Sequence, residues 1–299
     1  MVTAALMTVL SFGFLFVGAE LLVRGGAGLA LRLGLTALVV GLTVVAYGTS
    51  SPELLVSVKA AMAGQAGIAV GNVIGSNIFN IAVILGIAAL IKPIGASSTI
   101  VRRDGPVMVG VTLLGLFVLR DSVIERWEGG LLLAMSGIYT WWIIRHSRGV
   151  VTAEVQEGDT ASMPLGKGIG FVLAGLLILA FGSQLLVDNA VLLARAWGVS
   201  EAVIGLTVIA AGTSMPELAT SIVGAIRGQS DISLGNVVGS NIFNILFVLG
   251  LAALIHPIQA LGIRPSDQWF MLGVAVVLTP LMWTGKTIGR GEGLFLLGI

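Results

Sequence analysis

The chain has 299 residues, of which 56% are apolar and only 10% are charged, whereas roughly 25% of the residues carry a charge in an ordinary soluble domain. At about 20 residues per membrane span, such a chain accommodates ten helices and leaves no room for a soluble domain. The net charge of +1 and the lack of a dense basic cluster argue against a nucleic-acid partner. With no cysteine, the chain forms no disulfide, thiolate metal site or cysteine nucleophile. Composition therefore predicts an all-α polytopic membrane protein.

Ten apolar segments follow one another along the chain. The first is too long for the apolar region of a signal peptide, so it is interpreted as the first span. In chain order the segments cover about residues 2–23, 35–60, 66–91, 105–120, 127–146, 165–187, 199–225, 231–255, 266–285 and 289–299. The last segment is much shorter than the fifth, so we expect the tenth helix to be either short or clipped.

A polar stretch divides the chain into two halves. Residues 1–146 and residues 165–299 are each predicted to form five spans, and residues 147–164 are predicted to form a solvated linker between them. Within the first span, Glu20 and Arg24 are four residues apart, which predicts an ion pair on one helix face.

The two halves are copies of one unit. A shift of 164 residues places Gly41–Leu54 on Gly205–Leu218, and Gly71–Ile81 on Gly235–Ile245. Because each unit has an odd number of spans, the second must enter the membrane upside down relative to the first. Inverted repeats of this kind are typical of secondary transporters, whose substrate site lies at the membrane midplane between the repeats.

The basic residues predict the orientation of the chain in the membrane. Loops on the N-terminal side carry five of them, namely Lys59, Arg120, Arg126, Arg195 and Arg264. Loops on the opposite side carry eleven, namely Arg24, Arg32, Lys92, Arg102, Arg103, Arg145, Arg148, Lys167, Arg227, Lys286 and Arg290. The N-terminus is therefore predicted to lie outside the cytoplasm, and the linker inside it.

The most informative stretch is Gly48-Thr-Ser-Ser-Pro-Glu53, which recurs as Gly212-Thr-Ser-Met-Pro-Glu217. A charged residue at the centre of a membrane helix costs about 2.5–3.5 kcal/mol on insertion scales, so it indicates a function. The proline breaks the helix, and carbonyls near residues 46–49 are expected to lack hydrogen-bond partners and to line a cavity or a bound ion. Thr49 and Ser50 share a helix face with Glu53 wherever the helix persists. Such oxygen ligands suit sodium, calcium or magnesium.

A second repeated motif places polar side chains in a stripe along an apolar helix. The stripe consists of Asn72, Ser76 and Asn80 in the first copy and Asn236, Ser240 and Asn244 in the second. We expect these side-chain oxygens to supplement the two glutamates. Asn72 and Asn236 fit either of two roles, as ion ligands or as orienting partners. Asn77 and Asn241 lie off the stripe and are interpreted as structural.

The paired G-T-S-x-P-E and G-N-x-x-G-S-N-x-x-N motifs resemble the two α-repeats of the sodium/calcium exchanger family, in the cation/calcium antiporter superfamily. The resemblance covers nearly the whole chain. It implies ten transmembrane helices in two inverted five-helix repeats, with broken helices 2, 3, 7 and 8 around a midplane ion site. It also implies a prokaryotic member of the family in the cell (inner) membrane, with spans one and six sliding as gates across the other eight.

The resemblance carries over a set of ion ligands position by position. Glu53 and Glu217 would hold calcium, together with the carbonyl oxygens of Thr49 and Thr213. The outer and inner sodium sites would use the carbonyls of Ala46 and Ala210 together with Thr49, Ser50, Thr213, Ser214, Ser76 and Ser240. Asn80 and Asn244 would complete the middle of the site. Some relatives, including potassium-dependent ones, carry aspartate at the position of Asn244, so the asparagine here resembles the potassium-independent exchangers.

The implied activity is exchange of three sodium ions for one calcium ion by alternating access. Two glutamates neutralise one calcium ion but leave one excess positive charge with three sodium ions, so exchange is expected to be electrogenic. Protons are expected to compete with the cations for the two carboxylates, since burial penalises a charge that has no counter-ion. Sodium and calcium are the substrates. No cofactor, obligate protein partner or enzymatic activity is expected.

Three other functions compete with this interpretation. A proton/calcium antiporter of the same superfamily carries G-N-x-x-E where this chain has G-T-S-x-P-E, and a potassium-dependent sodium/calcium exchanger remains the other antiporter alternative. A cation channel would conduct without any counter-ion. An intramembrane hydrolase is disfavoured, because the chain has no H-E-x-x-H motif and both His146 and His256 fall at the ends of spans.

Overall fold

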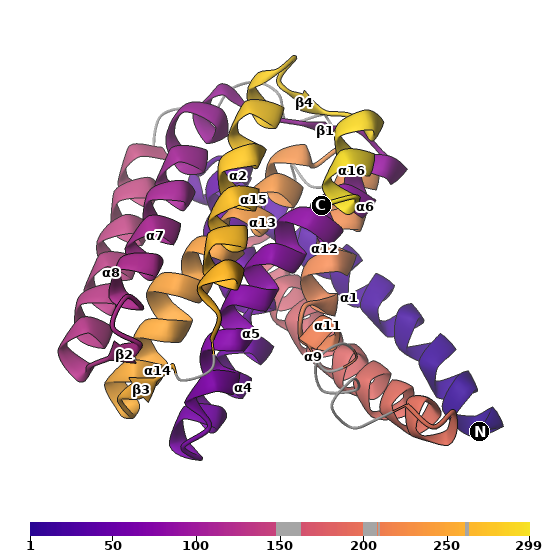
Figure 1. The fold of residues 1–299 in the computed structure, drawn as a ribbon. Coiled ribbons are helices and arrows are strands. Elements are labelled where there is room, and N and C mark those ends of the chain that lie inside the picture. The colour runs from indigo at the N-terminus through magenta and orange to yellow at the C-terminus, as the bar shows by residue number, and fades with distance from the viewer. Residues whose placement is uncertain (148–162, 200–207, 209, 261–262) are drawn as a thin grey trace.

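A computed structural model describes residues 1–147, 163–199, 208, 210–260 and 263–299 (Figure 1). Most of the predicted linker (residues 148–162) and the start of the seventh predicted span lie outside the described residues. Apart from very short strands, the described elements are helices, which confirms the all-α fold class.

The first repeat alternates long helices with segmented ones. Its elements are α1 (Val2–Leu33), α2 (Ala37–Val40), the π-helical segment η1 (Gly41–Val45), α3 (Ala46–Thr49), α4 (Ser51–Met62), α5 (Ala66–Phe79), the π-helical η2 (Asn80–Leu85), α6 (Gly86–Ile91), β1 (Ile94–Gly95), the π-helical η3 (Ile100–Asp104), α7 (Gly105–Val118), β2 (Val123–Ile124) and α8 (Arg126–Ser147). The first span is longer than predicted, because α1 continues past residue 23 to Leu33.

The second repeat follows the first with a constant offset. Its described elements are α9 (Leu165–Ala196), α11 (Ala210–Thr213), α12 (Met215–Ile226), α13 (Ser230–Phe243), the π-helical η5 (Asn244–Leu249), α14 (Gly250–Ile255), β3 (Ile258–Gln259), α15 (Pro265–Trp283), β4 (Thr287–Ile288) and α16 (Arg290–Leu297). The bounds of α12, α13, η5 and α14 lie 164 residues after those of α4, α5, η2 and α6. The duplication seen in the sequence is therefore a duplication of structure.

The described helices follow the order of the predicted spans along the chain. By length and hydropathy, four single helices can cross a membrane, namely Val2–Leu33, Ala66–Ile91, Leu165–Ala196 and Ser230–Ile255. A fifth span is the bent pair Ala37–Thr49 and Ser51–Met62. The helices α7, α8, α12 and α15 occupy the positions of further predicted spans, and α16 covers only 8 residues. Among the described residues, up to five of the ten predicted spans are thus long and apolar enough to cross a membrane.

The interruptions of the spans are of two kinds. In the second span the chain bends by 47° between α3 and α4, at the point where Pro52 removes a backbone donor from the first turn of α4. In the third and eighth spans, where breaks were also predicted, the helix continues from Ala66 to Ile91 and from Ser230 to Ile255. Neither stretch contains a proline, so the helix axis is kept and the interruption is a π-helical segment, a feature that is frequent at functional sites.

Two small strand pairs demonstrate the inversion of the repeats. Strand β1 pairs with β4, with Ile94 opposite Ile288, and β2 pairs with β3, with Ile124 opposite Ile258. Since β3 and β4 are the repeat equivalents of β1 and β2, the two pairs are symmetry mates. They lie at opposite ends of the helix bundle (Figure 1). Each end therefore joins one strand from each repeat, as an inverted duplication requires.

The helices α1 and α9 form an antiparallel pair that leans away from the rest of the bundle (Figure 1). Glycines let their backbones touch. A Cβ atom on Gly18 would lie 2.9 Å from the backbone nitrogen of Leu179, and one on Gly175 would lie 2.7 Å from that of Leu22. Such small-residue contacts are a common way of packing helices in membranes.

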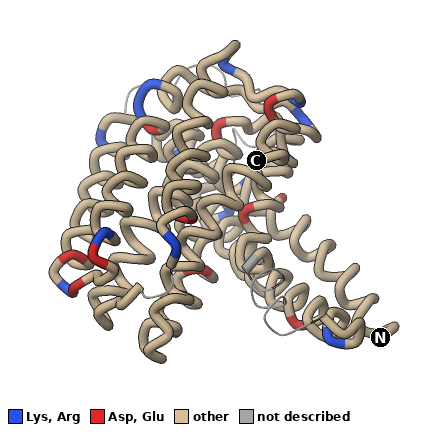
Figure 2. The backbone as a smooth tube through the Cα atoms, in the orientation of Figure 1, with Lys and Arg blue, Asp and Glu red and all other residues tan. Residues whose placement is uncertain are grey.

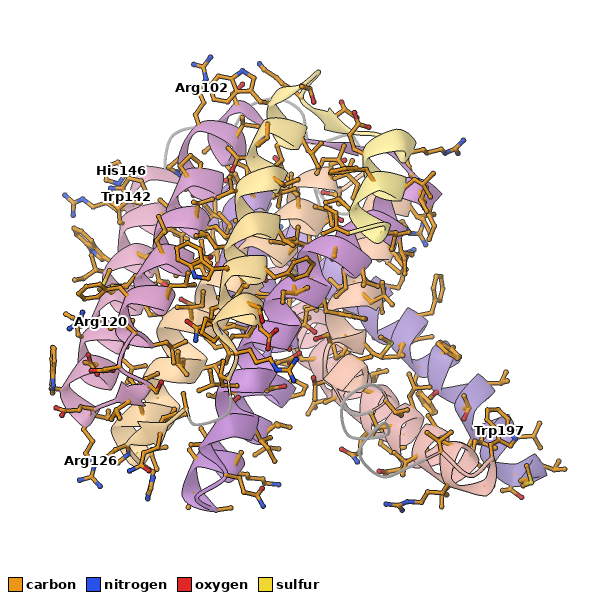
Figure 3. The ribbon with its side chains drawn as sticks, in the orientation of Figure 1. Arg102, Arg120, Arg126, Trp142, His146 and Trp197 are labelled. Carbon is orange, nitrogen blue, oxygen red and sulfur yellow. The ribbon has the colours of Figure 1, made fainter. Side chains whose placement is uncertain are left out.

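Charged residues concentrate toward the two ends of the main bundle (Figure 2). Arg102 lies at one end, and Arg120 and Arg126 lie at the other (Figure 3). These positions agree with the two sets of loops distinguished in the sequence. Which end faces the cytoplasm stays a prediction from the charge counts.

Candidate cation-binding site

Each of the two motif glutamates lies in the first turn of a helix that begins with a proline. Glu53 follows Pro52 in α4, and Glu217 follows Pro216 in α12. Both side chains are buried, with 1% of their surface exposed. The partial positive charge of a helix N-terminus stabilises a carboxylate at this position. The two proline breaks thus place two acidic groups inside the bundle at helix ends that favour them.

Serine hydroxyls from opposite repeats hold the two carboxylates together. Ser50 Oγ donates to Glu217 Oε1 at 2.8 Å, and Ser214 Oγ donates to Glu53 Oε1 at 2.7 Å. The partner of each serine is therefore the glutamate of the other repeat and not its neighbour on its own helix. Because each serine lies only three residues before the glutamate of its own repeat, these crossed bonds bring both carboxylates to one centre.

Ser76 contacts the same centre, and the other predicted hydroxyl residues are buried. Ser76 Oγ donates to Glu53 Oε1 at 3.5 Å and accepts from Ser214 Oγ at 3.4 Å. Ser240 is fully buried, and its Oγ has no hydrogen-bond partner in the described part of the chain. Thr49 and Thr213 are buried as well. All six predicted hydroxyl residues thus lie in the interior of the bundle.

Asn72 and Asn236 are orienting residues in this structure. Asn72 Nδ2 donates to the backbone oxygen of Glu53 at 3.1 Å and to Ser57 Oγ at 2.9 Å. In the second repeat Asn236 Nδ2 makes the equivalent bonds to Glu217 O and Ser221 Oγ, at 3.3 and 3.2 Å. The Oδ1 atom of Asn236 accepts from Thr49 Oγ1 at 3.1 Å. Of the two roles left open by the sequence, the contacts favour the orienting one.

Asn80 and Asn244 begin the π-helical segments η2 and η5. Asn80 Nδ2 donates to Asn241 Oδ1 at 3.1 Å, and Asn244 Nδ2 donates to Asn77 Oδ1 at 3.0 Å. The NH2 group of each amide is thus used by the opposite repeat. The Oδ1 atoms of Asn80 and Asn244 are buried and accept no hydrogen bond from the described residues.

Four carboxylate and amide oxygens of the predicted ligands are buried without a hydrogen bond. They are Glu53 Oε2, Glu217 Oε2, Asn80 Oδ1 and Asn244 Oδ1, each unpartnered within the described residues. Leaving a buried polar atom unpaired costs about 1–3 kcal/mol, and more for a charged one. Hard oxygen ligands of this kind bind sodium or calcium. The described residues contain no group of three or more His, Cys, Asp or Glu side chains, so the two carboxylates act with neutral oxygens.

The backbone carbonyls around the proline breaks differ from the prediction. Ala46 O accepts from Ser50 N at 3.0 Å, Gly48 O accepts from Ser51 Oγ at 2.8 Å, and Gly212 O accepts from Ser183 Oγ at 2.7 Å. The prediction that carbonyls near residues 46–49 lack partners is therefore wrong for Ala46, which keeps its ordinary helix bond from Ser50. It is also wrong for Gly48, because Ser51 Oγ replaces the backbone donor that Pro52 lacks. Ala210, the equivalent of Ala46, is the first residue of α11.

A cavity of about 1040 Å³ reaches the site between α4 and α9. Its walls include Pro52 and Leu55 from α4, Ser183 and Val191 from α9, and Thr213 from the second repeat's motif. Arg195, near the C-terminal end of α9, also lines it. The cavity therefore connects one side of the bundle, the side on which α9 ends, with a predicted ion ligand.

These features define a class of membrane protein. Two inverted repeats bury a shared, oxygen-lined centre with two carboxylates, and a cavity leads to this centre from one side. Secondary transporters place their ion sites in this way, at the repeat interface beside discontinuous helices.

Comparison with known proteins agrees with this class. The profile of the family described as "Sodium/calcium exchanger protein" matches residues 3–145 and 167–299. The chain is 38% identical over 310 residues to the inner membrane protein YrbG of Escherichia coli (strain K12), across 100% of this chain and 94% of YrbG. It is 29% identical over 334 residues to the sodium/calcium exchanger MaX1 of Methanosarcina acetivorans, across 98% of this chain and 95% of MaX1. A structure of the sodium-calcium exchanger NCX_Mj superposes with a TM-score of 0.86 at 30% identity, covering 99% of this chain and 96% of NCX_Mj.

The chain belongs to the sodium/calcium exchanger family. It is an integral membrane protein of the cation/calcium antiporter class, in a family of transporters. The resemblance noted from the two repeated motifs is thereby confirmed.

Proposed function

We propose that this protein exchanges sodium for calcium across a prokaryotic inner membrane by alternating access. The observation that carries the proposal is the set of four buried oxygens, Glu53 Oε2, Glu217 Oε2, Asn80 Oδ1 and Asn244 Oδ1, which receive no hydrogen bond from the described residues. A divalent cation between the carboxylates compensates both charges and uses all four oxygens. Calcium accepts six to eight oxygen ligands in a flexible geometry, so the carbonyls of Thr49 and Thr213 complete its coordination.

Sodium occupies the same centre and its flanks in exchange for calcium. Ser50, Ser76 and Ser214 donate hydrogen bonds to the glutamates, and Ser240 is buried. Hydroxyl and carbonyl oxygens are hard ligands. In this proposal the four serines form the outer and inner sodium sites with Thr49, Thr213 and the carbonyls of Ala46 and Ala210. Three sodium ions against one calcium ion leave one net positive charge to cross the membrane in each cycle.

The cavity between α4 and α9 supports access from one side at a time. Its repeat equivalent would lie between α12 and α1, but there α1 packs along α12, and Glu20 of α1 forms an ion pair with Arg227 at the end of α12. On the orientation predicted from the basic residues, the cavity opens to the outside and the packed side faces the cytoplasm. The described arrangement is then an outward-facing one.

Calcium-45 uptake into proteoliposomes tests the proposal. Vesicles loaded with sodium and diluted into sodium-free medium should accumulate calcium, and vesicles with equal sodium on both sides should not. Because net positive charge leaves the vesicle as calcium enters, an interior-positive potential should accelerate uptake and an interior-negative one should slow it. Uptake that ignores the sodium gradient contradicts sodium coupling, and uptake that ignores voltage contradicts the proposed stoichiometry.

The same vesicles separate the remaining alternatives. Uptake driven by a proton gradient without sodium would indicate a proton/calcium antiporter, and uptake that requires potassium would indicate a potassium-dependent one. A channel would equilibrate calcium without any counter-ion. Mild acidification should slow sodium-driven uptake, since protons neutralise the carboxylates that calcium needs, and raising the calcium concentration should restore the rate.

A further inference from the structure

Asn77 and Asn241 are buried asparagines that contact the proposed ligands of the opposite repeat. They are 2% and 1% exposed, and both lie off the polar stripe formed by the ligand residues. Asn77 Oδ1 accepts from Asn244 Nδ2 at 3.0 Å, and Asn241 Oδ1 accepts from Asn80 Nδ2 at 3.1 Å. Each bond joins residues more than 150 positions apart, so the sequence of a single helix does not reveal it.

An asparagine ligand works only when its oxygen faces the cation. The amide carries an acceptor oxygen on one side and two N–H donors on the other, and a rotation of half a turn exchanges them. With the NH2 group toward a cation, the amide repels the ion that it should bind. A fixed acceptor on the far side of the amide prevents this rotation, because it holds the NH2 group away from the centre.

The acceptors are fixed in their turn. Asn77 Nδ2 donates to the backbone oxygen of Asn241 at 3.2 Å, so Asn77 Oδ1 must point toward Asn244. Asn241 Nδ2 contacts the sulfur of Met108 at 3.6 Å, and sulfur is a weak acceptor. The side chain of Asn77 is therefore held more firmly than that of Asn241. The bond from Asn77 Nδ2 to Asn241 O also joins the two repeats at this point.

We propose that Asn77 and Asn241 are positioning residues for cation binding, and that each acts on the opposite repeat. Asn77 orients Asn244, and Asn241 orients Asn80, so that both Oδ1 atoms face the cation. The inference rests on the proposed function, because it assigns a role toward the same site. The specific claim is that Asn77 orients Asn244 in the other repeat. It does not orient Asn80, which lies three residues after Asn77 in the same span.

Double-mutant cycles on calcium binding test this claim. Calcium-45 binding to the purified full-length protein is measured for Asn77→Ala, Asn244→Ala, Asn80→Ala and the two doubles that contain Asn77→Ala. Losing a buried hydrogen bond that orients a ligand is expected to weaken calcium binding about tenfold. Asn77→Ala with Asn244→Ala should bind within about twofold of Asn244→Ala alone, because residues that act as a unit are not additive. Asn77→Ala with Asn80→Ala should instead multiply the two losses.

The mirror cycle uses Asn241→Ala with Asn80→Ala as the coupled pair, and with Asn244→Ala as the additive one. It is the measurement of choice if Asn77→Ala does not yield folded protein, since the NH2 group of Asn241 contacts only the sulfur of Met108 among the described residues. Asn189→Ala serves as the control, because Asn189 bonds only to Leu185 O within α9, as far as the described residues show. That variant should bind calcium like the parent.

The outcomes separate this inference from the proposed function. Coupling across the repeats, with additivity within them, supports the crossed positioning role. Additivity in both cycles, or coupling within a repeat, overturns it and leaves a packing role for the two asparagines, while calcium binding by the parent stands. A parent protein that binds no calcium overturns both.

Discussion

The two repeats are alike at the centre of the molecule and different at its edge. At the centre, the two crossed serine bonds are mirror images, with Ser50 on Glu217 and Ser214 on Glu53 at nearly equal distances. Glu53 also accepts a bond from Ser76, whereas the Oγ of Ser240, the repeat equivalent of Ser76, has no partner among the described residues. At the edge, the helices α1 and α9 contact the rest of the bundle through different residues. If the proposed function holds, a cation would meet equivalent serine and glutamate ligands from either repeat, while the outer contacts would set which side is open.

The edge contacts differ in both charge and hydrogen bonding. Glu20 of α1 pairs with Arg24 and with Arg227, whereas the repeat equivalents of Glu20 and Arg227 are Gln184 and Ala63. The carbonyl released by the proline is capped locally in the first repeat, by Ser51. In the second repeat Ser183 of α9 caps it, and the position of Ser51 is a methionine. The predicted Glu20–Arg24 ion pair is confirmed, and Arg227 is its unexpected third member.

The strongest test of the symmetric centre neutralises each glutamate in turn. Glu53→Gln and Glu217→Gln should each reduce sodium-driven calcium uptake by on the order of a hundredfold or more, since removing one charge of a buried ionic cluster costs about 3–5 kcal/mol. The two losses should be similar, because both carboxylates are buried and each accepts a hydrogen bond from the serine of the opposite repeat. Vesicle uptake at matched protein content measures both. A variant that transports like the parent would contradict the proposed site.

Removing either of the crossed serine hydroxyls should lower calcium affinity by a smaller amount, and the effect should depend on the glutamate of the opposite repeat. Ser50→Ala and Ser214→Ala each remove a hydrogen bond to a carboxylate, which is worth about 1.5–3 kcal/mol, so calcium affinity should fall roughly tenfold or more. Because the bonds cross, Ser50→Ala should lose most of its effect in a Glu217→Gln background and keep it in a Glu53→Gln background. Equal effects in both backgrounds would show that the serines act within their own repeats.

Removing the serine hydroxyl that caps the carbonyl released by the proline should lower stability more in the second repeat than in the first. Ser183 is 4% exposed, and Ser183→Ala leaves the carbonyl of Gly212 without this donor in the interior, at a cost of about 1–3 kcal/mol. Ser51 is exposed, so Ser51→Ala should have little effect. Thermal unfolding of the two variants in detergent gives the comparison, with Ser183→Ala melting at the lower temperature. The reverse order would remove the distinction between the two caps.

Removing the ion pair of Glu20 should have the smallest effect of these changes, because partly exposed ion pairs contribute about 0–1 kcal/mol to the stability of one arrangement. Glu20→Gln should shift the equilibrium between open and closed sides by a factor of about two to five away from the arrangement described here. The chain has no cysteine, so a single Val191→Cys in the cavity reports the open side through labelling by an impermeant maleimide. Labelling should slow in Glu20→Gln.

A transplant of the ion pair sharpens that measurement. Gln184→Glu with Ala63→Arg places an equivalent of the Glu20–Arg227 pair on the other repeat, where it should favour closure of the cavity and again slow the labelling of Val191→Cys. Both this variant and Gln184→Glu alone lose the bond from Gln184 to Asp188, so the comparison isolates the added arginine. Gln184→Glu alone lacks the basic partner and is the matched control. Unchanged labelling in the double variant would show that the pair does not set the balance between sides.

The features that could be predicted from the sequence are those carried by motifs that occur in both repeats. Two carboxylates next to prolines, with hydroxyls at fixed spacing, are visible without any structure, and burying two such charges is costly unless a cation compensates them. In the structure, Ser50, Ser76 and Ser214 contact the two glutamates. The Oγ of Ser240 and the Oδ1 atoms of Asn80 and Asn244 are buried without a hydrogen-bond partner among the described residues. The inverted repeat followed from the constant offset and the odd number of spans.

The contacts that the sequence does not reveal join helices that are far apart in the chain. Asn77 and Asn241 are interpreted as structural from their position on their own helix, which gives no sign of their partners on the other repeat. Their recurrence at the common offset was the available signal, since a buried amide kept in both copies needs a partner. Ser183 and Arg227 gave no such signal, because neither has an equivalent in the first repeat. The π-helical segments were also missed, as helix periodicity does not distinguish them.

The strand pair β1–β4 has a consequence for how the protein is made. Ile94 pairs with Ile288, a residue of the other repeat that lies far later in the chain. Contacts between such distant segments form late and slow the completion of a fold. We therefore expect β1 to stay unpaired until β4 has been made. A truncated chain that ends before β4 should leave that edge open to quality-control proteases even if all its long helices have been inserted.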